Sequence, residues 1–113
     1  MQLAILESGR QLCSRLETAY TFGSRFRGWM MREPFGPGQG LHLKPCRSVH
    51  TFWMKATIDV LHLGPDGRVT GMEHRLKPGK IGRTFDGTKS VVELPEGTLA
   101  TASVQVGQTA VIG

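Results

Sequence analysis

The sequence predicts an α+β, mainly β fold: a compact barrel-like or strongly curved antiparallel sheet of about six to eight short strands with one short helix, at about residues 21–32. Three observations support this prediction. Fifteen glycines and six prolines among 113 residues imply many turns. Short runs rich in β-branched residues alternate with turn signals. Between residues 21 and 32, the apolar residues follow a helical spacing instead.

The first third of the chain is expected to form a β-hairpin and then the helix. Residues 2–6 and 11–19 have strand composition and are separated by the turn signal Ser8-Gly9. Pro34 ends the helix that follows, and residues 33–40 form a loop before a short strand at 41–45. The helix is predicted from the i, i+4, i+7, i+8 spacing of Phe22, Phe26, Trp29 and Met30.

The segment CRSVHTFWM, residues 46–54, is predicted to be a strand because its β-branched and aromatic residues are poor helix formers. Neither of its faces is polar, so we expect it to be covered on both sides. Cys46, His50 and Met54 then lie along one face, with about 13 Å between residues four apart.

The remaining elements follow from buried runs and strong turns. Residues 58–63 (IDVLHL) are expected to form a buried strand, GPDG at 64–67 a tight turn, and residues 68–74 an antiparallel return. The basic loop at 75–89 is long enough to suggest a function. Residues 90–94 form a strand, PEGT at 95–98 starts a helical turn, and residues 103–112 hold one or two closing strands.

Composition restricts the class of protein. We expect one soluble, cytoplasmic domain over residues 1–113, because no apolar run approaches the ~18 residues of a membrane span and the N-terminus lacks a basic leader. Cys13 and Cys46 would stay reduced in that compartment. The net charge of +5 permits nucleic-acid binding. The cationic residues are scattered, however, so nucleic acid is not the favoured partner.

Motifs in the second half of the chain occur in a characteristic order: HTFWM, IDVLHL, a PDG turn, VVELPEGT and VGQ. This order resembles the bacterial and archaeal family called domain of unknown function 192, over about residues 18–112. The resemblance implies a β-rich fold with the helix against a curved sheet, and it implies no reaction. The residues that match the family's motifs are Arg25, Gly28, Met30, Trp53, Met54, Ile58, Asp59, Glu93, Leu94, Pro95 and Gly97. The chain departs from the family pattern at Trp29, Thr57 and Gln108, where leucine, proline and aspartate are usual.

The expected function is that of a binding or accessory module with a small pocket near His50, Trp53 and Asp59. Its partner is a small ligand or a protein, and the oligomeric state is left open. We expect no cofactor, and no metal ion, because strand geometry separates the Cys46, His50 and Met54 side chains too widely. The predicted pocket residues are Cys46, Ser48, His50, Trp53, Met54 and Asp59, a composition that also fits an ordinary core.

Two alternatives remain open. The first is a hydrolase or transferase that uses Cys46 or Asp59 with a histidine such as His42, His62 or His74. Asp59 has a structural interpretation too, in which it pairs with Arg25 or accepts backbone N–H bonds from residues 55–57. Glu93 is expected to pair with a basic residue such as Arg83. The second, weaker alternative is nucleic-acid binding through the loop at 75–89, with Arg75, Lys77, Lys80, Arg83 and Lys89.

Overall fold

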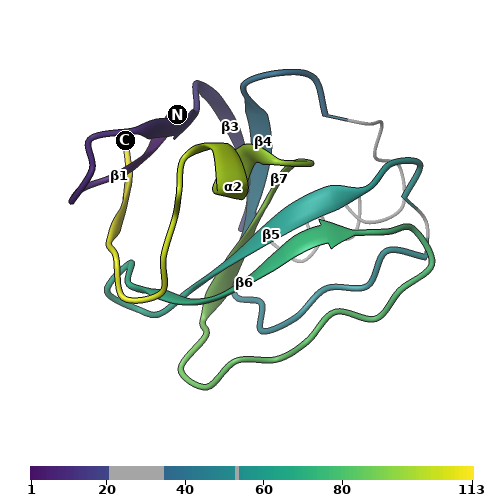
Figure 1. The fold of residues 1–113 in the computed structure, drawn as a ribbon. Coiled ribbons are helices and arrows are strands. Elements are labelled where there is room, and N and C mark those ends of the chain that lie inside the picture. The colour runs from purple at the N-terminus through teal and green to yellow at the C-terminus, as the bar shows by residue number, and fades with distance from the viewer. Residues whose placement is uncertain (21–34, 53) are drawn as a thin grey trace.

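A computed structural model of the protein describes residues 1–20, 35–52 and 54–113. The helix expected at about residues 21–32 lies outside these ranges. The described chain is mainly β, with eight strands and one short helix in two sheets (Figure 1). The smaller sheet has the order β2 (Gln11–Cys13), β1 (Leu3–Ile5), β8 (Ala110–Ile112). The larger has the order β3 (Arg15–Ala19), β4 (Gln39–Leu43), β7 (Ser90–Pro95), β5 (Ile58–Leu63), β6 (Val69–Leu76), and the helix is α2 (Thr98–Thr101).

The expected barrel-like or strongly curved antiparallel sheet is not confirmed. Among the described strands the large sheet ends at β3 and β6 and does not close on itself. It is also mixed, because β3 runs parallel to β4, from Arg15 opposite Gln39 to Ala19 opposite Leu43. A parallel pair requires a long crossover between its strands, and residues 20–38 supply it.

The predicted hairpin is present, but its second strand is divided between the sheets. β1 pairs antiparallel with β2 in the small sheet, and the chain then continues as β3 in the large one. At the division, the N–H groups of Ser14 and Arg15 both donate to the carbonyl of Gly38, at 3.0 and 2.9 Å. The two ends of the chain meet beside β1, where the N–H of Gln2 donates to the Gly113 carbonyl at 2.7 Å (Figure 1).

β5 confirms the prediction of a fully buried strand. All six of its residues are buried, and it pairs antiparallel with β6 on one side and β7 on the other. Leu61 and Leu63 face a core shared with the small sheet and α2. Ile58 and Val60 face a second core, which also contains Cys46 and Val49. The large sheet is therefore covered on both faces.

The strand predicted for residues 46–54 does not form. In the described part of this segment, the strand-like pairing is limited to one β-bridge, between His50 and Ile81. β5 already has β6 and β7 as neighbours, so no edge next to it is vacant for a further strand. The segment instead crosses over the second core and buries Cys46 and Val49 there.

Asp59 connects β5 to β6 and α2. Its side chain is fully buried. Pairing between β5 and β6 shifts between Ile58 and Val60, so that His74 and Arg75 both lie opposite Asp59. One carboxylate oxygen accepts the N–H of Arg75 at 3.0 Å, and the other accepts the N–H of Leu99 at 2.9 Å.

The bond to Leu99 caps α2 from a distant part of the chain. A cap usually comes from the side chain just before the helix, which bonds an N–H in the first turn. Here that position is Gly97, with a left-handed φ of 87°. Asp59 supplies the missing acceptor, so its two bonds come from β6 and α2 and not from residues 55–57.

We expect Asp59→Asn to lower the free energy of unfolding by about 2–3 kcal/mol, because the amide nitrogen cannot accept one of the two N–H groups. The measurement is urea denaturation followed by circular dichroism. The matched control is Asp86→Asn at an exposed position, with an expected change below about 0.5 kcal/mol. Equal effects of the two substitutions would contradict the role given to Asp59.

Candidate functional site

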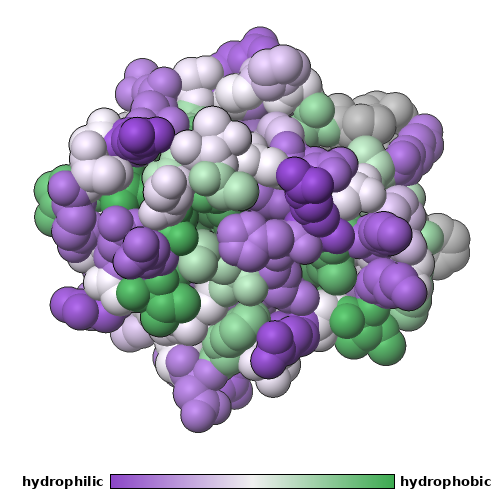
Figure 2. Space-filling model, viewed as in Figure 1, coloured by the Kyte–Doolittle hydropathy of each residue, from purple (hydrophilic) through white to green (hydrophobic). Residues whose placement is uncertain are grey.

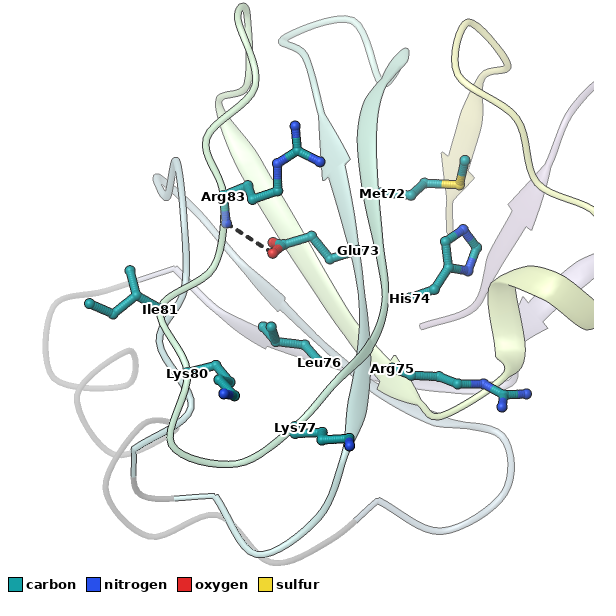
Figure 3. Close-up of a pocket in the computed structure, with 9 residues that line it drawn as sticks. All are labelled: Met72, Glu73, His74, Arg75, Leu76, Lys77, Lys80, Ile81 and Arg83. Carbon is teal, nitrogen blue, oxygen red and sulfur yellow. Dashed lines mark hydrogen bonds between the residues drawn. The ribbon is translucent and has the colours of Figure 1, made fainter.

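A groove lies between the end of β6 and the loop at 77–83, which we call the loop groove. Its cavity volume is about 540 Å³. Figure 3 shows the side chains of Glu73 and Leu76 pointing from β6 toward the loop, with Lys80, Ile81 and Arg83 on the loop itself. Met72 and His74 point to the opposite side of β6. The loop groove is lined by Met72, Glu73, His74, Arg75, Leu76, Lys77, Lys80, Ile81 and Arg83.

Thr51 fixes the backbone of one half of the loop. Its side chain is fully buried, and its hydroxyl accepts the N–H of Lys80 at 2.9 Å while donating to the carbonyl of Lys77 at 2.6 Å. Main-chain bonds add to this: the N–H of Thr51 donates to the Lys80 carbonyl, and the N–H of Gly79 donates to the Thr51 carbonyl. The loop is thus held by its backbone, and the Lys77 and Lys80 side chains remain exposed.

Glu73 fixes the other half. One carboxylate oxygen accepts the N–H of Arg83 at 2.9 Å, and the other lies 2.9 Å from Nε2 of the fully buried His62. A Cβ atom at Gly82 would lie 2.9 Å from the Glu73 oxygen that faces His62 and 2.8 Å from the Val49 carbonyl oxygen, so only glycine fits there without movement. The close approach brings the loop down onto β6.

Phe85 packs next to the Glu73–His62 pair. Its ring lies against the His62 ring, with centroids 4.6 Å apart at 62°. It also covers Gly71, where a Cβ atom would sit only 2.3 Å from the ring carbons. The guanidinium of Arg83 lies 5.4 Å from the centroid of the same ring. Arg83 is therefore oriented by packing as well as by its backbone bond.

The charge of the loop groove is positive. Lys77, Lys80 and Arg83 extend from the loop, whereas Arg75 points away from it toward α2 (Figure 3). Arg75 lies 3.8 Å from Glu96, and this exposed ion pair contributes little. Glu73 is the one acidic residue among the described lining residues, and both of its oxygens already accept hydrogen bonds. The arrangement suits an anion better than a cation.

The predicted pocket residues that the structure describes have different surroundings. The Cys46 thiol donates to the Ser48 carbonyl at 3.1 Å, and Met54 packs against the second core. His50 is exposed and stacks on Phe52, with centroids 5.1 Å apart. Asp59 serves β6 and α2 on the other face of the sheet, and Trp53 lies outside the described residues.

Two buried histidines have partners that the sequence analysis did not assign. His62 meets Glu73, and Nδ1 of His42 lies 2.7 Å from the hydroxyl of Tyr20. Burial, together with the charge of Lys44, lowers the pKa of His42 from 6.5 to about 4. Both histidines occur within apolar runs, LHL and IDVLHL. A polar side chain in such a run is expected to be buried and to need a hydrogen-bond partner, as for Asp59. Within the described residues, no group of three or more His, Cys, Asp and Glu side chains is placed to hold a metal ion.

The motif residues of the second half lie together in the fold. Ile58 pairs with Pro95, Asp59 with Leu94, and Val60 with Glu93, so the two motif segments are adjacent strands. Ile58 and Glu93 are buried, and Gly97 begins the helix that Asp59 caps. The motif residues Arg25, Gly28 and Met30 lie outside the described residues, as does Trp53.

The exposed hydrophobic residues are scattered on the face that Figure 2 shows. Among its coloured residues, the hydrophobic ones lie in separate spots surrounded by hydrophilic ones. Such isolated exposure is normal for a folded protein. No helix of the described residues is long and apolar enough to cross a membrane.

The chain belongs to the family DUF192, described as an uncharacterized ACR, whose model matches residues 4–112. No curated protein matches the sequence significantly. Two crystal structures share the fold. One is a protein of unknown function from Novosphingobium aromaticivorans, with TM-score 0.79 and 20% identity, covering 99% of this chain and 84% of that one. The other, from Sinorhizobium meliloti, is a "putative transcription regulator", with TM-score 0.78 and 20% identity, covering 97% and 91%.

We expect Glu73→Gln to increase the amide exchange rate of Arg83 by about tenfold to a hundredfold, because the amide nitrogen replaces one of two acceptor oxygens. The measurement is hydrogen exchange followed residue by residue by NMR. Glu96→Gln, which alters an exposed carboxylate outside the loop groove, is the control and leaves this rate unchanged. Unchanged exchange in the Glu73 variant would show that Glu73 does not hold the loop.

We also expect stability to fall in acid because of His42. Its pKa is lower in the folded protein, about 4, than its ordinary 6.5. The unfolded chain therefore binds a proton first, and the contribution of neutral His42 is complete above pH 6.5 and is lost as the pH falls toward 4. The measurement is urea denaturation at pH 7 and at pH 5. Between these two pH values, the free energy of unfolding should fall by roughly 2 kcal/mol less in His42→Gln than in the unmodified protein. Parallel pH profiles would contradict this.

Proposed function

We propose that this chain is a binding module that holds a small anionic molecule, bearing phosphate or carboxylate groups, in the loop groove. The observation that carries the proposal is the set of three cations, Lys77, Lys80 and Arg83, on a loop whose backbone is fixed by Thr51 and Glu73. The class is the one expected from the sequence. The loop groove lies beside β6, whereas the pocket expected near His50, Trp53 and Asp59 includes a residue outside the described ranges and stays a prediction.

Preorganisation supports binding at this site. A ligand pays the cost of ordering any loop that it must fix, and that cost weakens affinity. Here the hydrogen bonds of Thr51 and Glu73 order the loop before any ligand arrives. The volume of about 540 Å³ falls within the roughly 300–1,000 Å³ of small-molecule sites. Leu76 adds an apolar surface on which the uncharged part of a ligand can pack.

Nucleic-acid binding is the second candidate, and one feature beside the loop groove favours it. Phe52 is 53% exposed and stacks on His50, whose backbone bridges to Ile81 of the loop. An exposed aromatic ring next to cations is the arrangement on which single-stranded bases stack. The Sinorhizobium meliloti protein is named as a transcription regulator, although the 20% identity carries the fold alone.

The enzyme alternative has less support from the geometry. Asp59 is fully buried and both of its oxygens accept main-chain N–H groups, so it is poorly placed to act as a general base. His62 and His42, two of the proposed partners for Cys46, instead lie against Glu73 and Tyr20. The Cys46 thiol donates to a carbonyl, an arrangement that does not favour the thiolate.

We expect pyrophosphate and citrate to shift the amide resonances of residues 77–83 saturably in an NMR titration. Lys77→Gln/Lys80→Gln should weaken the affinity by about a hundredfold, since each of the two charged contacts is worth roughly 1.5 kcal/mol. These two side chains are exposed, and the loop uses only the backbone of both residues for its anchoring, so the fold is preserved. The matched control is Arg15→Gln/Arg68→Gln, which makes the same change in net charge at exposed residues outside the loop groove. This control should leave the affinity unchanged.

A single-stranded oligonucleotide distinguishes the second candidate. If it binds far more tightly than pyrophosphate, and if Phe52→Ala removes that difference, the module binds nucleic acid. Equal loss of pyrophosphate affinity in both double variants would mean that only the overall charge matters, and the loop groove would not be the site. Shifts that never saturate would exclude both forms of the proposal.

A further inference from the structure

We propose that a second cavity, between β4, β7 and β8, binds a short-chain carboxylate. This cavity has a volume of about 170 Å³ and is separate from the loop groove, with which it shares none of the described lining residues. One wall is apolar and includes Leu63, Pro65 and Ile112. The lining also contains polar residues, which come from β4, β7 and their neighbours. Such an amphipathic cavity fits a ligand with one polar end and one apolar end.

His42 is the central polar group of this cavity. It is only 5% exposed, yet its Nε2 has no hydrogen-bond partner within the part of the chain that is described. Its Nδ1 faces Tyr20, which follows β3 on one side of β4. The two ring nitrogens point in widely different directions, so Nε2 faces away from Tyr20. Lys89 and Ser90 line the same cavity as His42, and Ser90 begins β7, the strand next to β4. Buried polar atoms are rarely left without a partner, and a ligand in the cavity would supply one.

The protonation states make Nε2 a donor. Burial keeps the pKa of His42 at about 4, so the ring is neutral at pH 7 and carries one proton. Burial also raises the pKa of the Tyr20 phenol, so this group keeps its proton. The phenol O–H is the stronger donor of the two groups and donates to Nδ1. The ring proton is then on Nε2, where it is available to an acceptor in the cavity.

The remaining polar groups also favour a negative ligand. Lys44 and Lys89 line the cavity, and none of its described lining residues is acidic. The Lys44 ammonium lies 5.7 Å from the centroid of the Tyr20 ring, which keeps it beside His42. The Ser90 hydroxyl is a further donor. A carboxylate would thus meet His42, the two lysines and Ser90, while its hydrocarbon chain packs on the apolar wall.

The experiment is an NMR titration of the full chain at pH 7 with sodium butyrate as the probe. The readouts are the ring nitrogen resonances of His42 and the backbone amides of Lys89 and Ser90. We expect saturable shifts with butyrate, and binding at least about tenfold weaker with the neutral analogue butyramide. Lys89→Gln should weaken butyrate binding several-fold. Lys77→Gln/Lys80→Gln, which alters only the loop groove, should not change it.

The ring of His42 is tested by His42→Phe, which keeps an aromatic side chain and removes both nitrogens. This variant should lose butyrate binding. If it does not fold, as judged by circular dichroism, the Lys89→Gln titration decides the outcome instead. Equal affinity for butyrate and butyramide would overturn the proposal, as would shifts that remain linear at every concentration. Inorganic phosphate binding as tightly as butyrate would also overturn it, because the apolar wall would then have no role.

Discussion

The fold depends on one buried carboxylate. An ionised side chain inside a protein is strongly unfavourable unless hydrogen bonds replace its lost hydration. Asp59 meets this requirement with two main-chain N–H groups, one from β6 and one from α2. The same two bonds solve two other problems, because the extra residue in β6 and the first turn of α2 each leave an N–H without a partner. Three elements are therefore joined at one side chain.

The same principle extends from Asp59 to the loop groove. Arg75, which Asp59 holds, has a left-handed φ of 56° and lies two residues before the loop begins. Within the loop, Thr51 and Glu73 play the same part. A side-chain oxygen of each buried residue accepts a main-chain N–H, from Lys80 and Arg83 respectively. The conformation of the loop thus follows from acceptors placed in the sheet and in the segment over the second core. It does not follow from the loop's own side chains.

The parts of the fold that were predictable from sequence are those with local causes. β5, the turn at 64–67, β7 and the start of α2 follow from apolar runs and turn residues, and the structure confirms them. Residues 46–54 have strand composition but no strand, because composition does not reveal whether a sheet edge is vacant. The parallel pairing of β3 with β4 was not predicted either, because the connection between them carries no sequence signal of direction.

Asp59 was recognisable as unusual, but its partner Leu99 is 40 residues away. Thr51 and Glu73 were missed as site residues for the same reason, and the partner of His42, Tyr20, is 22 residues away.

The backbone anchoring of the loop has an evolutionary consequence. Most substitutions that create a new specificity also reduce stability, which limits how far a binding site can change. At positions 77, 80 and 81 the side chains are exposed, and the hydrogen bonds that hold the loop, as described above, are made by the backbone or by Thr51 and Glu73. Exposed positions of this kind usually tolerate substitution. Relatives with this framework can therefore change what they bind through substitutions at these three positions alone. Selection for folding acts on a different set of residues.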